Sequence, residues 1–391
     1  MNRPSSTVEP DSRVTECSVC LFHTGIIGIS ISSLGTCNIC QTVIALKDEY
    51  GTGTSRGQEA LSKIVAEIKN SSKKRKYDCV IGVSGGTDSS YLLLLAKEWG
   101  LRPLAVHYDN TWNSATATTN ISILLKELEI DLVTYVVRNK EADDIFRSAF
   151  KAGVAELDAS TDLAFAYLLR KIARKNKIQF ILEGHSFLEE GITPLGRNYF
   201  DGSYIRDIHR RFGSIGIGTY PLMTLIKFLR EISFGNIQFI RPLWYIDYEK
   251  KTAKEELKTH GWKDYGGHHL ENWLTAYMHS SYLPGKFSTD MRNNVLSALI
   301  RRGSITKHEA KISYALPPHG SESATSYFIK RIGLSEKEYK DIMEMPPRSW
   351  TEFKTYKRYF EILRPFFRIL LKRRRITQSF FLKYCGKGQY L

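Results

Sequence analysis

The chain has 391 residues, of which 42% are hydrophobic and 25% are charged, a composition typical of a globular protein with room for two domains. Its 56 Lys and Arg residues outnumber the 41 Asp and Glu residues, and the net charge of +15 favours anionic partners such as nucleotides, nucleotide sugars, RNA or anionic lipid. No run of eighteen apolar residues predicts a membrane-spanning helix, and the polar N-terminus lacks the apolar segment of a secretory signal. We therefore expect a cytoplasmic protein.

Four of the six cysteines lie close together near the N-terminus. They form two CxxC pairs, Cys17 with Cys20 and Cys37 with Cys40. This spacing predicts a zinc site in a reducing compartment, and four thiolate ligands leave no position for water, so the zinc is expected to be structural. We assign this module to residues 1–45. A helix and a basic linker are expected over residues 46–76, where apolar residues recur with helical spacing.

From residue 77 onward, apolar runs alternate with helical patterns. Strands are predicted at 77–83, 101–109, 131–137 and 178–185, and helices at 90–99, 116–129, 141–153 and 158–176. This alternation predicts an α/β domain over 77–190, with a parallel sheet and flanking crossover helices. Helical patterns at 219–232, 247–259, 269–279, 290–301 and 306–313 predict a mostly helical substrate-binding region over 191–320. Residues 321–391 form a basic, aromatic tail.

The strongest chemical signal is the sequence Ser-Gly-Gly-Thr-Asp-Ser at residues 84–89, between the first predicted strand and its helix. Two glycines allow a sharp turn and a close approach to an anion, and the hydroxyl groups and the helix N-terminus complete an anion cradle. No lysine follows the glycines, as it would in a GxxxxGK[ST] loop, and the spacing is not GxGxxG. The alternative is a plain glycine turn with a helix cap.

In this setting the segment resembles the signature of the PP-loop ATP pyrophosphatases. The resemblance implies that the segment binds the pyrophosphate of ATP, with Mg²⁺ between phosphate oxygens. The pyrophosphate-binding residues would be Ser84, Gly85, Gly86, Thr87, Asp88 and Ser89, of which Asp88 and Ser89 are the catalytic candidates. The next predicted strand ends with His107 and Asp109, which we expect to meet the adenosine because ligands of such sheets lie beyond the carboxyl ends of the strands.

Two later segments, GHSFLEEGITP (184–194) and GGHHLENWLTAYMHSSYLPGKFSTDMR (266–292), embed polar residues among glycine and aromatics. They resemble the N-acetyl sugar amidotransferases of surface-polysaccharide (LPS O-antigen) biosynthesis, over a stretch from about Cys17 to about Ala310. This resemblance implies adenylation of the N-acetyl amide oxygen of a nucleotide-activated sugar and its replacement by ammonia, which leaves an acetamidino group. His185 is the acid/base candidate, and the substrate-binding candidates are Glu190, His269, Glu271, Lys286 and Arg292.

The same resemblance implies that ammonia comes from a separate glutaminase, similar to that of histidine biosynthesis, with a cyclase-like subunit beside it. Cys79 lies in a predicted buried strand and Cys385 in the basic tail, so neither is typical of a glutaminase nucleophile. No DNA partner is expected.

Three alternatives stay open. A tRNA-modifying PP-loop enzyme of the thiolase type fits the zinc module and the basic surface, although no cysteine occurs near residues 160–162. A zinc-knuckle nucleic-acid-binding protein would require a vestigial ATP loop. Residues 354–375 interleave basic and apolar residues, which predicts an amphipathic helix, kinked at Pro365, for the inner membrane surface, for glutaminase docking or for plain packing.

Overall fold

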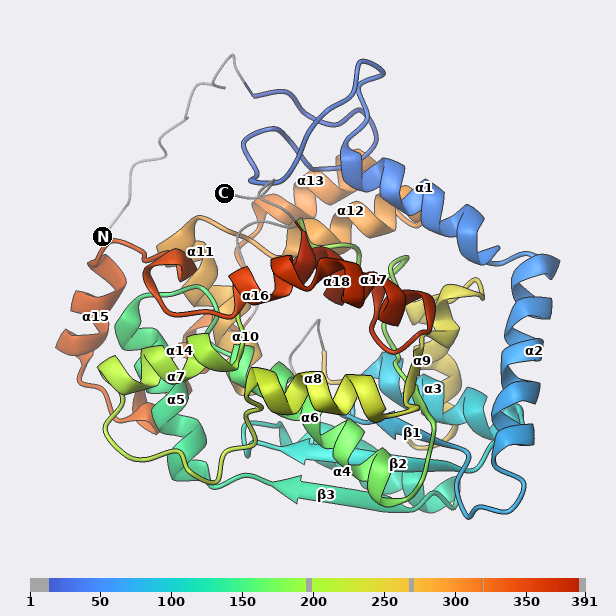
Figure 1. Cartoon of the computed structure of the whole chain (residues 1–391). Coiled ribbons are helices and arrows are strands. Elements are labelled where there is room, and N and C mark those ends of the chain that lie inside the picture. Colours follow the sequence, from blue (N-terminus) through green and yellow to red (C-terminus); the bar gives the residue numbers. More distant parts are fainter. Residues whose placement is uncertain (1–13, 195–198, 267–270, 319, 387–391) are drawn as a thin grey trace.

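The computed structural model describes residues 14–194, 199–266, 271–318 and 320–386. At its base lies a five-stranded parallel sheet (Figure 1). In sequence order its strands are β1 (Cys79–Gly82), β2 (Pro103–Asp109), β3 (Leu132–Val136), β4 (Phe180–Leu182) and β5 (Gln238–Ile240). Their spatial order is β3-β2-β1-β4-β5, and every neighbouring pair is parallel. The predicted α/β class with a parallel sheet is confirmed.

The central strand, β1, is the point where the strand order reverses. Cys79 pairs in register with Pro103 of β2 on one side and with Phe180 of β4 on the other. The chain leaves β1 toward β2 and later returns to the opposite side at β4. In open parallel sheets, such a switch point leaves a crevice at the carboxyl ends of the two diverging strands, where ligands bind.

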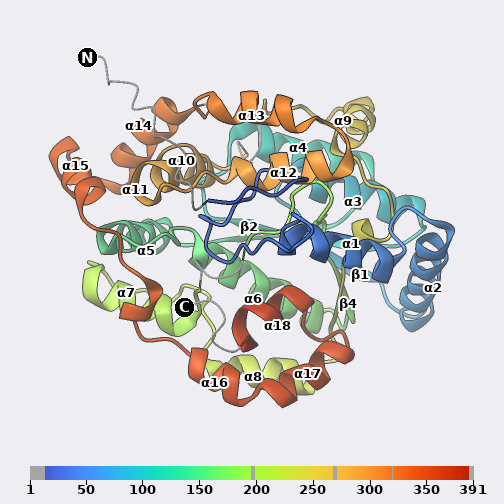
Figure 2. The same ribbon diagram turned by 90° about the horizontal axis from the view of Figure 1, so that it is seen from above.

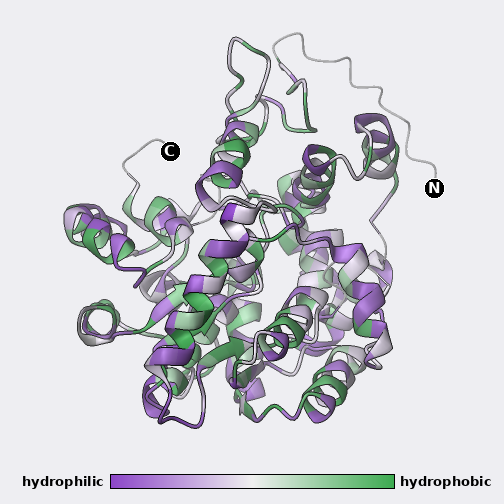
Figure 3. Cartoon of the chain, turned by 90° about the vertical axis from the view of Figure 1, so that its right-hand side faces the viewer, coloured by the Kyte–Doolittle hydropathy of each residue, from purple (hydrophilic) through white to green (hydrophobic). Residues whose placement is uncertain are grey.

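Both faces of the sheet are covered by helices, which explains why its central strands are buried and mostly apolar. On one face Ile81 packs with Leu92 of α3 (Thr87–Glu98) and with Ile121 of α4 (Ala115–Glu127), and α2 (Ser55–Ser71) closes this cluster. On the other face Val80 packs with Leu169 of α6 (Ala159–Lys175). The helices around the sheet carry hydrophobic and hydrophilic residues, as Figure 3 shows.

A second core lies beside the sheet and is helical. It joins α5 (Asn139–Ala152), α7 (Gly202–Phe212), α10 (Trp273–Tyr277) and α14 (Ser321–Ile332). Its centre is aromatic: the rings of Tyr277 and Phe328 stack with centroids 3.9 Å apart, and Phe150 lies edge-on to Phe328 at 5.2 Å. This cluster attaches the helical half of the chain to the α/β half.

The remaining helices lie around these cores. Their bounds are α1 (Asn38–Tyr50), α8 (Leu225–Phe234), α9 (Lys250–Thr259), α11 (Leu283–Phe287), α12 (Arg292–Arg302), α13 (Lys307–Ala315), α15 (Glu336–Glu344), α16 (Lys357–Ile362), α17 (Arg364–Lys372) and α18 (Gln378–Cys385). Short 3-10 turns span Pro242–Trp244 and Trp350–Glu352, and a π-helical turn spans Met278–Tyr282.

The basic tail is a packed helical unit. The helix expected over 354–375 is two helices, α16 and α17, because Pro365 lacks an N–H group and occupies the first turn of the second helix. Phe360, Phe367 and Leu370 are buried with Ile232 of α8 and Phe381 of α18. Figure 2 shows α16, α17 and α18 gathered around α8. Part of the apolar surface of this segment therefore packs inside the protein, whereas Tyr359, Ile362 and Ile369 are exposed.

The structure also extends the sheet beyond the predicted domain end at residue 190. The strand β5 pairs with β4 from Phe180 opposite Gln238 to Leu182 opposite Ile240. It has only three residues and begins with a polar one, so its sequence lacks the long apolar run that marks the other strands. Among the described residues, no helix is long and apolar enough to cross a membrane.

Candidate functional site

The loop that follows β1 has the backbone geometry of an anion site. Gly85 adopts a φ of +81°, and a Cβ atom there would collide with the carbonyl oxygen of Ala117. Gly86 is the N-cap of α3 and supplies no side-chain hydrogen bond to the first turn. The exposed N–H groups of a helix N-terminus carry partial positive charge and attract anions. Glycine is thus required at Gly85, and the N-terminus of α3 lies directly after the loop at the carboxyl end of β1.

The back of this loop is anchored by polar side chains. The carbonyl oxygen of Gly85 accepts hydrogen bonds from Nε1 of Trp262 (3.2 Å) and from Nδ2 of Asn120 (3.4 Å). Since the C=O and the next N–H of a peptide unit point in opposite directions, this anchoring turns the following N–H toward the open side of the loop. There Ser84 Oγ accepts from Gly86 N–H at 3.3 Å and lies 3.3 Å from Ser89 Oγ.

One buried polar group at the loop lacks a protein partner. Thr87 is fully buried, and its Oγ1 makes no hydrogen bond in the described part of the chain. Its N–H donates to the hydroxyl of Tyr265 at 3.4 Å. A buried hydroxyl without a partner is costly, which fits a loop built to be completed by phosphate oxygens. The predicted pyrophosphate residues therefore fit ATP, and a Mg²⁺ ion on those phosphate oxygens would neutralise their charge.

Asp88 does not face open solvent but is held by a pair of partners from beyond β5. Its Oδ1 accepts from the hydroxyl of Tyr248 at 2.6 Å, and its Oδ2 lies 2.7 Å from Nζ of Lys250. Burial alone would raise the pKa of Asp88, but the Lys250 ammonium outweighs it and the pKa is lowered. Burial likewise opposes the charge of Lys250, whereas Asp88 and Glu190 raise its pKa. Both groups are therefore ionised, and Lys250 is a fixed cation beside the loop.

His185 lies at the end of β4, next to this ion pair. Its Nδ1 is 3.3 Å from the donor Nε1 of Trp244, and its Nε2 is 3.6 Å from a carboxylate oxygen of Glu190. Because an indole nitrogen only donates, Nδ1 accepts and Nε2 carries the proton. Burial, together with Arg241, lowers the pKa of His185 to about 3. Such an imidazole is neutral and carries its proton on Nε2, and since 38% of the side chain is exposed, its acid/base role stays a prediction.

The adenosine candidates at the end of β2 have structural partners. His107 Nδ1 is 2.9 Å from the carbonyl oxygen of Val83, and its Nε2 is 3.3 Å from Nδ2 of Asn113. Asp109 accepts from the N–H of Thr111 at 2.6 Å and thereby closes the turn after β2. Both residues lie at the carboxyl end of the strand, as expected, and His107 fixes the strand directly ahead of the loop.

Of the five predicted substrate residues, two lie at the loop. Glu190 shares a side-chain hydrogen bond with Asp88, and Oε1 of Glu271 would lie 3.5 Å from a Cβ atom at Gly86. Glu271 is placed there because residues 271–273 pair with the turn after β2, where Ser114 N–H donates to the carbonyl oxygen of Glu271 at 2.8 Å. His269 lies outside the described residues.

The other two predicted substrate residues are engaged in structural contacts elsewhere. Lys286 Nζ donates to the carbonyl oxygens of Ile342 and Met345, both at 2.6 Å, at the end of α15. Arg292 pairs with Asp290 at the start of α12, and its Nη1 donates to the carbonyl oxygen of Leu316 at 2.7 Å. The cationic groups of both residues bind backbone carbonyl oxygens at helix ends in the helical core. Neither residue contacts the 84–89 loop.

Sequence reasoning missed Tyr248, Lys250, Trp262 and Tyr265. They follow β5, more than a hundred residues after the loop, and reach it because α9 packs against α3. They were missed because the strand β5 was not predicted. Residues that directly follow a parallel strand lie at the edge of the sheet where ligands bind.

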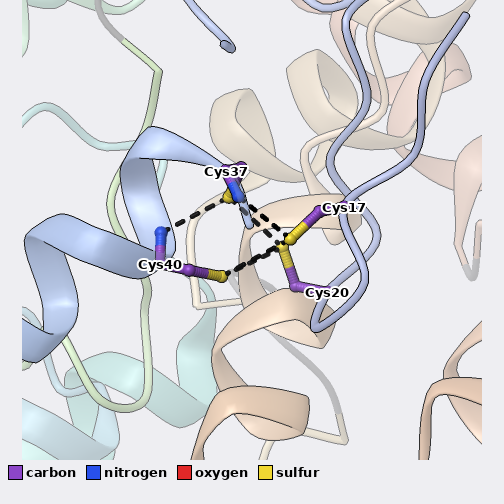
Figure 4. Close-up of side chains that lie close together, drawn as sticks. All are labelled: Cys17, Cys20, Cys37 and Cys40. Carbon is purple, nitrogen blue, oxygen red and sulfur yellow. Dashed lines mark hydrogen bonds between the residues drawn. The ribbon is translucent and has the colours of Figure 1, made fainter. Parts of the chain in front are cut away.

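The four N-terminal cysteines come together as predicted, and all four are buried (Figure 4). Their sulfur atoms lie within 4.8 Å of one another, with separations of 3.8 Å for Cys17–Cys40 and 3.7 Å for Cys20–Cys37. A tetrahedral ion with metal–sulfur bonds of about 2.3 Å requires sulfur separations of roughly 3.8 Å. The N–H of Cys37 also points at Cys17 Sγ, at 3.2 Å. The cluster fits one tetrahedral metal ion.

The cysteine module docks on the helical half of the chain. Lys307 Nζ donates to the carbonyl oxygen of Cys17 at 2.6 Å, and Leu21 N–H donates to Ser297 Oγ at 3.2 Å. The same helix, α12, ends at Arg302, which pairs with Glu189 at 3.1 Å. One helix thus connects the cysteine module to the loop after β4.

These features define a parallel α/β protein whose first strand leads into a glycine-rich anion loop at the switch point of its sheet. Residues 271–366 match the family model described as LPS biosynthesis protein WbpG-like, C-terminal domain. Over this stretch, the match confirms the resemblance to surface-polysaccharide biosynthesis proteins. The match also corrects its extent: it continues past Ala310 into the tail, to residue 366.

Among curated proteins, the chain is 27% identical over 306 residues to the uncharacterized protein MJ1599 of Methanocaldococcus jannaschii, covering 76% of this chain and 91% of that protein. Among solved structures it is similar to NMN synthetase from Francisella tularensis (14% identity, 72% of this chain and 95% of that one, TM-score 0.32). It is also similar to the U34-tRNA thiolase NcsA from Methanococcus maripaludis, solved with its [4Fe-4S] cluster (12% identity, 78% and 90%, TM-score 0.33). Both superpositions are partial, and the fold class rests on the strand order.

Proposed function

We propose that this protein is an ATP-dependent, AMP-forming amidotransferase that converts the N-acetyl group of an activated sugar into an acetamidino group. The observation that carries the proposal is the glycine-rich loop at the switch point, with the Lys250 cation beside it, in a chain whose residues 271–366 are similar to the WbpG-like C-terminal domain. An AMP-forming reaction needs a pyrophosphate site with a fixed cation nearby, and a polysaccharide pathway offers amides to activate.

In the proposed reaction, the amide oxygen of the N-acetyl group attacks the α-phosphorus of ATP and pyrophosphate leaves. Ammonia then adds to the activated carbon, and AMP departs with the former amide oxygen. The product is an amidine, lighter than the substrate by one mass unit because NH has replaced O. Adenylation is needed because the oxygen of an amide is otherwise a poor leaving group.

The chain's own residues would contribute binding, charge and orientation. The start of α3 and the hydroxyl of Thr87 would bind the pyrophosphate, and Lys250 would stabilise the negative charge that grows on it. A bound Mg²⁺ ion would add a second positive charge on the phosphate oxygens. His185, which carries its proton on Nε2, would be the acid/base candidate of the site.

The cysteine cluster is proposed to hold a structural zinc ion, and the ammonia is proposed to come from a separate glutaminase. Four cysteine ligands fill a tetrahedral ion and leave no position for a reacting water. The two other cysteines do not support sulfur transfer at the loop. Cys79 is fully buried in β1, where burial raises its pKa, and burial raises the pKa of the buried Cys385 to about 12.

The test measures AMP and pyrophosphate release from ATP in the presence of ammonium chloride and a panel of nucleotide-activated N-acetyl sugars. Total tRNA replaces the sugars in a parallel reaction. Sugar-dependent AMP release, with a product one mass unit lighter, is the expected result. AMP release that depends on tRNA alone would assign the loop to RNA modification and overturn the proposal.

A further inference from the structure

The C-terminal helices α16 and α17 have one buried side and one exposed side. Figure 2 shows both helices along one edge of the molecule. Phe360, Phe367 and Leu370 fill the core on the buried side. The exposed residues recur at intervals of three and four, which places them along the opposite side. We call this side the tail face, and it consists of Arg358, Tyr359, Ile362, Pro365, Arg368, Ile369, Lys372 and Arg373.

The tail face is positively charged. Its four cations form no ion pair within the described part of the chain. The one carboxylate between residues 357 and 374 is that of Glu361, which pairs with Lys357 at 3.4 Å. Because four like charges without partners repel one another, an anionic surface would stabilise them.

The tail face also exposes apolar side chains between its cations. Tyr359 is 56% exposed, Ile362 65% and Ile369 52%. The neighbouring helix α8, whose Phe228 ring lies 6.0 Å from that of Phe360, adds Ile226, which is 80% exposed. Single exposed apolar residues are common on proteins. Their alternation with unpaired Arg and Lys is typical of a helix that lies in a membrane interface, where apolar groups reach the acyl boundary and cations reach the headgroups.

A basic cleft of about 810 Å³ adjoins the end of α17. Arg375 links the two, since it donates to the carbonyl oxygen of Ser233 at 2.6 Å and to Oδ1 of Asn236, a residue of the cleft, at 2.8 Å. The one carboxylate in the described lining, Glu231, pairs with Arg174. Five cations line the cleft: Arg75, Arg174, Lys177, Lys227 and Arg230.

This cleft lies at the edge of the sheet away from the proposed ATP loop. Gln179 and Ile237 of its lining directly precede β4 and β5, so the cleft is at the amino ends of these strands. The loop at residues 84–89 lies at the carboxyl end of β1, and the sheet is parallel. An anion held in the cleft is therefore not a substrate of the loop, and the cleft instead extends the positive surface that begins at the tail face.

We propose that the tail face docks this protein on an anionic phospholipid membrane, with α16 and α17 lying in the plane of the interface. Ile362 and Ile369 enter the boundary between headgroups and acyl chains, and the four cations bind lipid phosphates. The basic cleft adds positive charge beside them. Attachment of this kind is reversible and weakens with salt. The inference goes beyond the proposed function, because it assigns a surface and no chemical step.

The experiment is flotation of the full-length protein with vesicles on a density gradient. Vesicles of phosphatidylcholine alone are compared with vesicles of equal parts phosphatidylcholine and phosphatidylglycerol, at low and at raised salt. Arg368→Gln/Lys372→Gln removes two cations from the tail face, and the matched control, Lys337→Gln/Lys340→Gln, removes two exposed cations from α15.

A second pair of variants tests the apolar contribution. Ile369→Ser removes an exposed aliphatic side chain from the tail face. Ile312→Ser is its control, because Ile312 lies on α13 and is 55% exposed. All four variants alter exposed side chains, and circular dichroism checks that each protein is folded.

We expect the wild type to float with the anionic vesicles, to stay behind with phosphatidylcholine alone and to be released by raised salt. Arg368→Gln/Lys372→Gln should lower the partition coefficient roughly 10- to 30-fold, and Ile369→Ser roughly 5-fold, whereas both controls should float like the wild type. Failure of the wild type to float with anionic vesicles would overturn the proposal and leave an acidic protein as the partner that the charge favours. Equal flotation of the tail-face variants and their controls would overturn it too. The AMP-release assay is independent of these outcomes.

Discussion

The carboxylate of Asp88 and the ammonium of Lys250 lie 2.7 Å apart, although 162 residues separate them in the sequence. Asp88 belongs to the first turn after β1, and Lys250 begins the helix that follows β5. The contact holds the segment that follows β5 against the loop that follows β1. For the proposed pyrophosphate site, this contact supplies the cation that the loop itself lacks, from a distant part of the sequence.

Replacing Lys250 should lower the rate of AMP formation more than it lowers the stability of the folded protein. Lys250→Met leaves Asp88 buried without its partner, which we expect to cost about 3 kcal/mol of stability, and to lower AMP formation by roughly 10²- to 10³-fold. The double variant Asp88→Asn/Lys250→Met should regain stability without regaining activity. Lys251→Met, one residue along and exposed, is the control. Full AMP release from a folded Lys250→Met protein would remove Lys250 from the site.

A methyl group at Gly85 should disable the loop. In Gly85→Ala, the new Cβ would collide with the Ala117 carbonyl at a φ of +81°, a strain of about 1–3 kcal/mol. We expect ATP binding, measured by calorimetry, to be lost at temperatures where circular dichroism shows a folded protein. The matched substitution is Gly216→Ala, because nothing lies within 4 Å of a Cβ there. An unchanged ATP affinity in Gly85→Ala would contradict the assignment of the loop.

The predicted metal ion can be measured directly as the metal content per chain. Plasma mass spectrometry should find one zinc ion per chain, and Cys40→Ser should lose it together with part of the protein's thermal stability. Cys385→Ser, a buried cysteine outside the cluster, should keep its zinc. Iron in place of zinc would show that the cluster has another role.

One buried carboxyl group should make stability depend on pH. Glu156 is buried and accepts a hydrogen bond from the Tyr204 hydroxyl at 2.8 Å, and burial raises its pKa to about 7. In the unfolded chain the group ionises near its ordinary pKa of 4.5, so the folded state binds the extra proton between these values. Stability conferred by this site is therefore present below pH 4.5 and falls as the pH rises toward 7, by about 3 kcal/mol in all.

Glu156→Gln keeps an acceptor for Tyr204 and removes the charge. Its Tm at pH 8 should exceed that of the wild type, and the difference should vanish near pH 4.5. The exposed Glu59→Gln should follow the wild-type profile at every pH. A Glu156→Gln profile parallel to the wild type would show that the carboxyl group stays ionised in the folded protein.

The sequence predicted the parts of the fold whose signals are local. Four strands and their crossover helices were visible as apolar runs such as residues 101–109, and the CxxC pairs were visible as spacing. The strand β5 was not, because three residues beginning with Gln238 carry too little pattern. With β5 missing, Lys250 and Tyr248 had no predicted place at the ligand edge of the sheet.

The predicted substrate residues show that a sequence pattern alone does not reveal what a side chain contacts. Glu190 and Glu271 lie at the loop, whereas Lys286 and Arg292 cap helices in the helical core, and all four looked alike as polar residues among aromatics. Only the three-dimensional contact decides whether a cation binds a backbone carbonyl or a ligand. The tail was likewise visible as basic and apolar, but the helix on which it packs, α8, lies more than a hundred residues earlier.

The helix α12 is held at Ser297 by the cysteine module and at Arg302 by the glutamate that precedes Glu190. Because α12 is held at both ends, a displacement of one end would move the other. A shortened protein beginning at residue 46 would therefore lose, besides the cysteine cluster, a contact that holds α12 and with it the segment after β4. If the proposed activity stands, we expect its smallest active unit to include the cysteine module from Cys17 to Cys40.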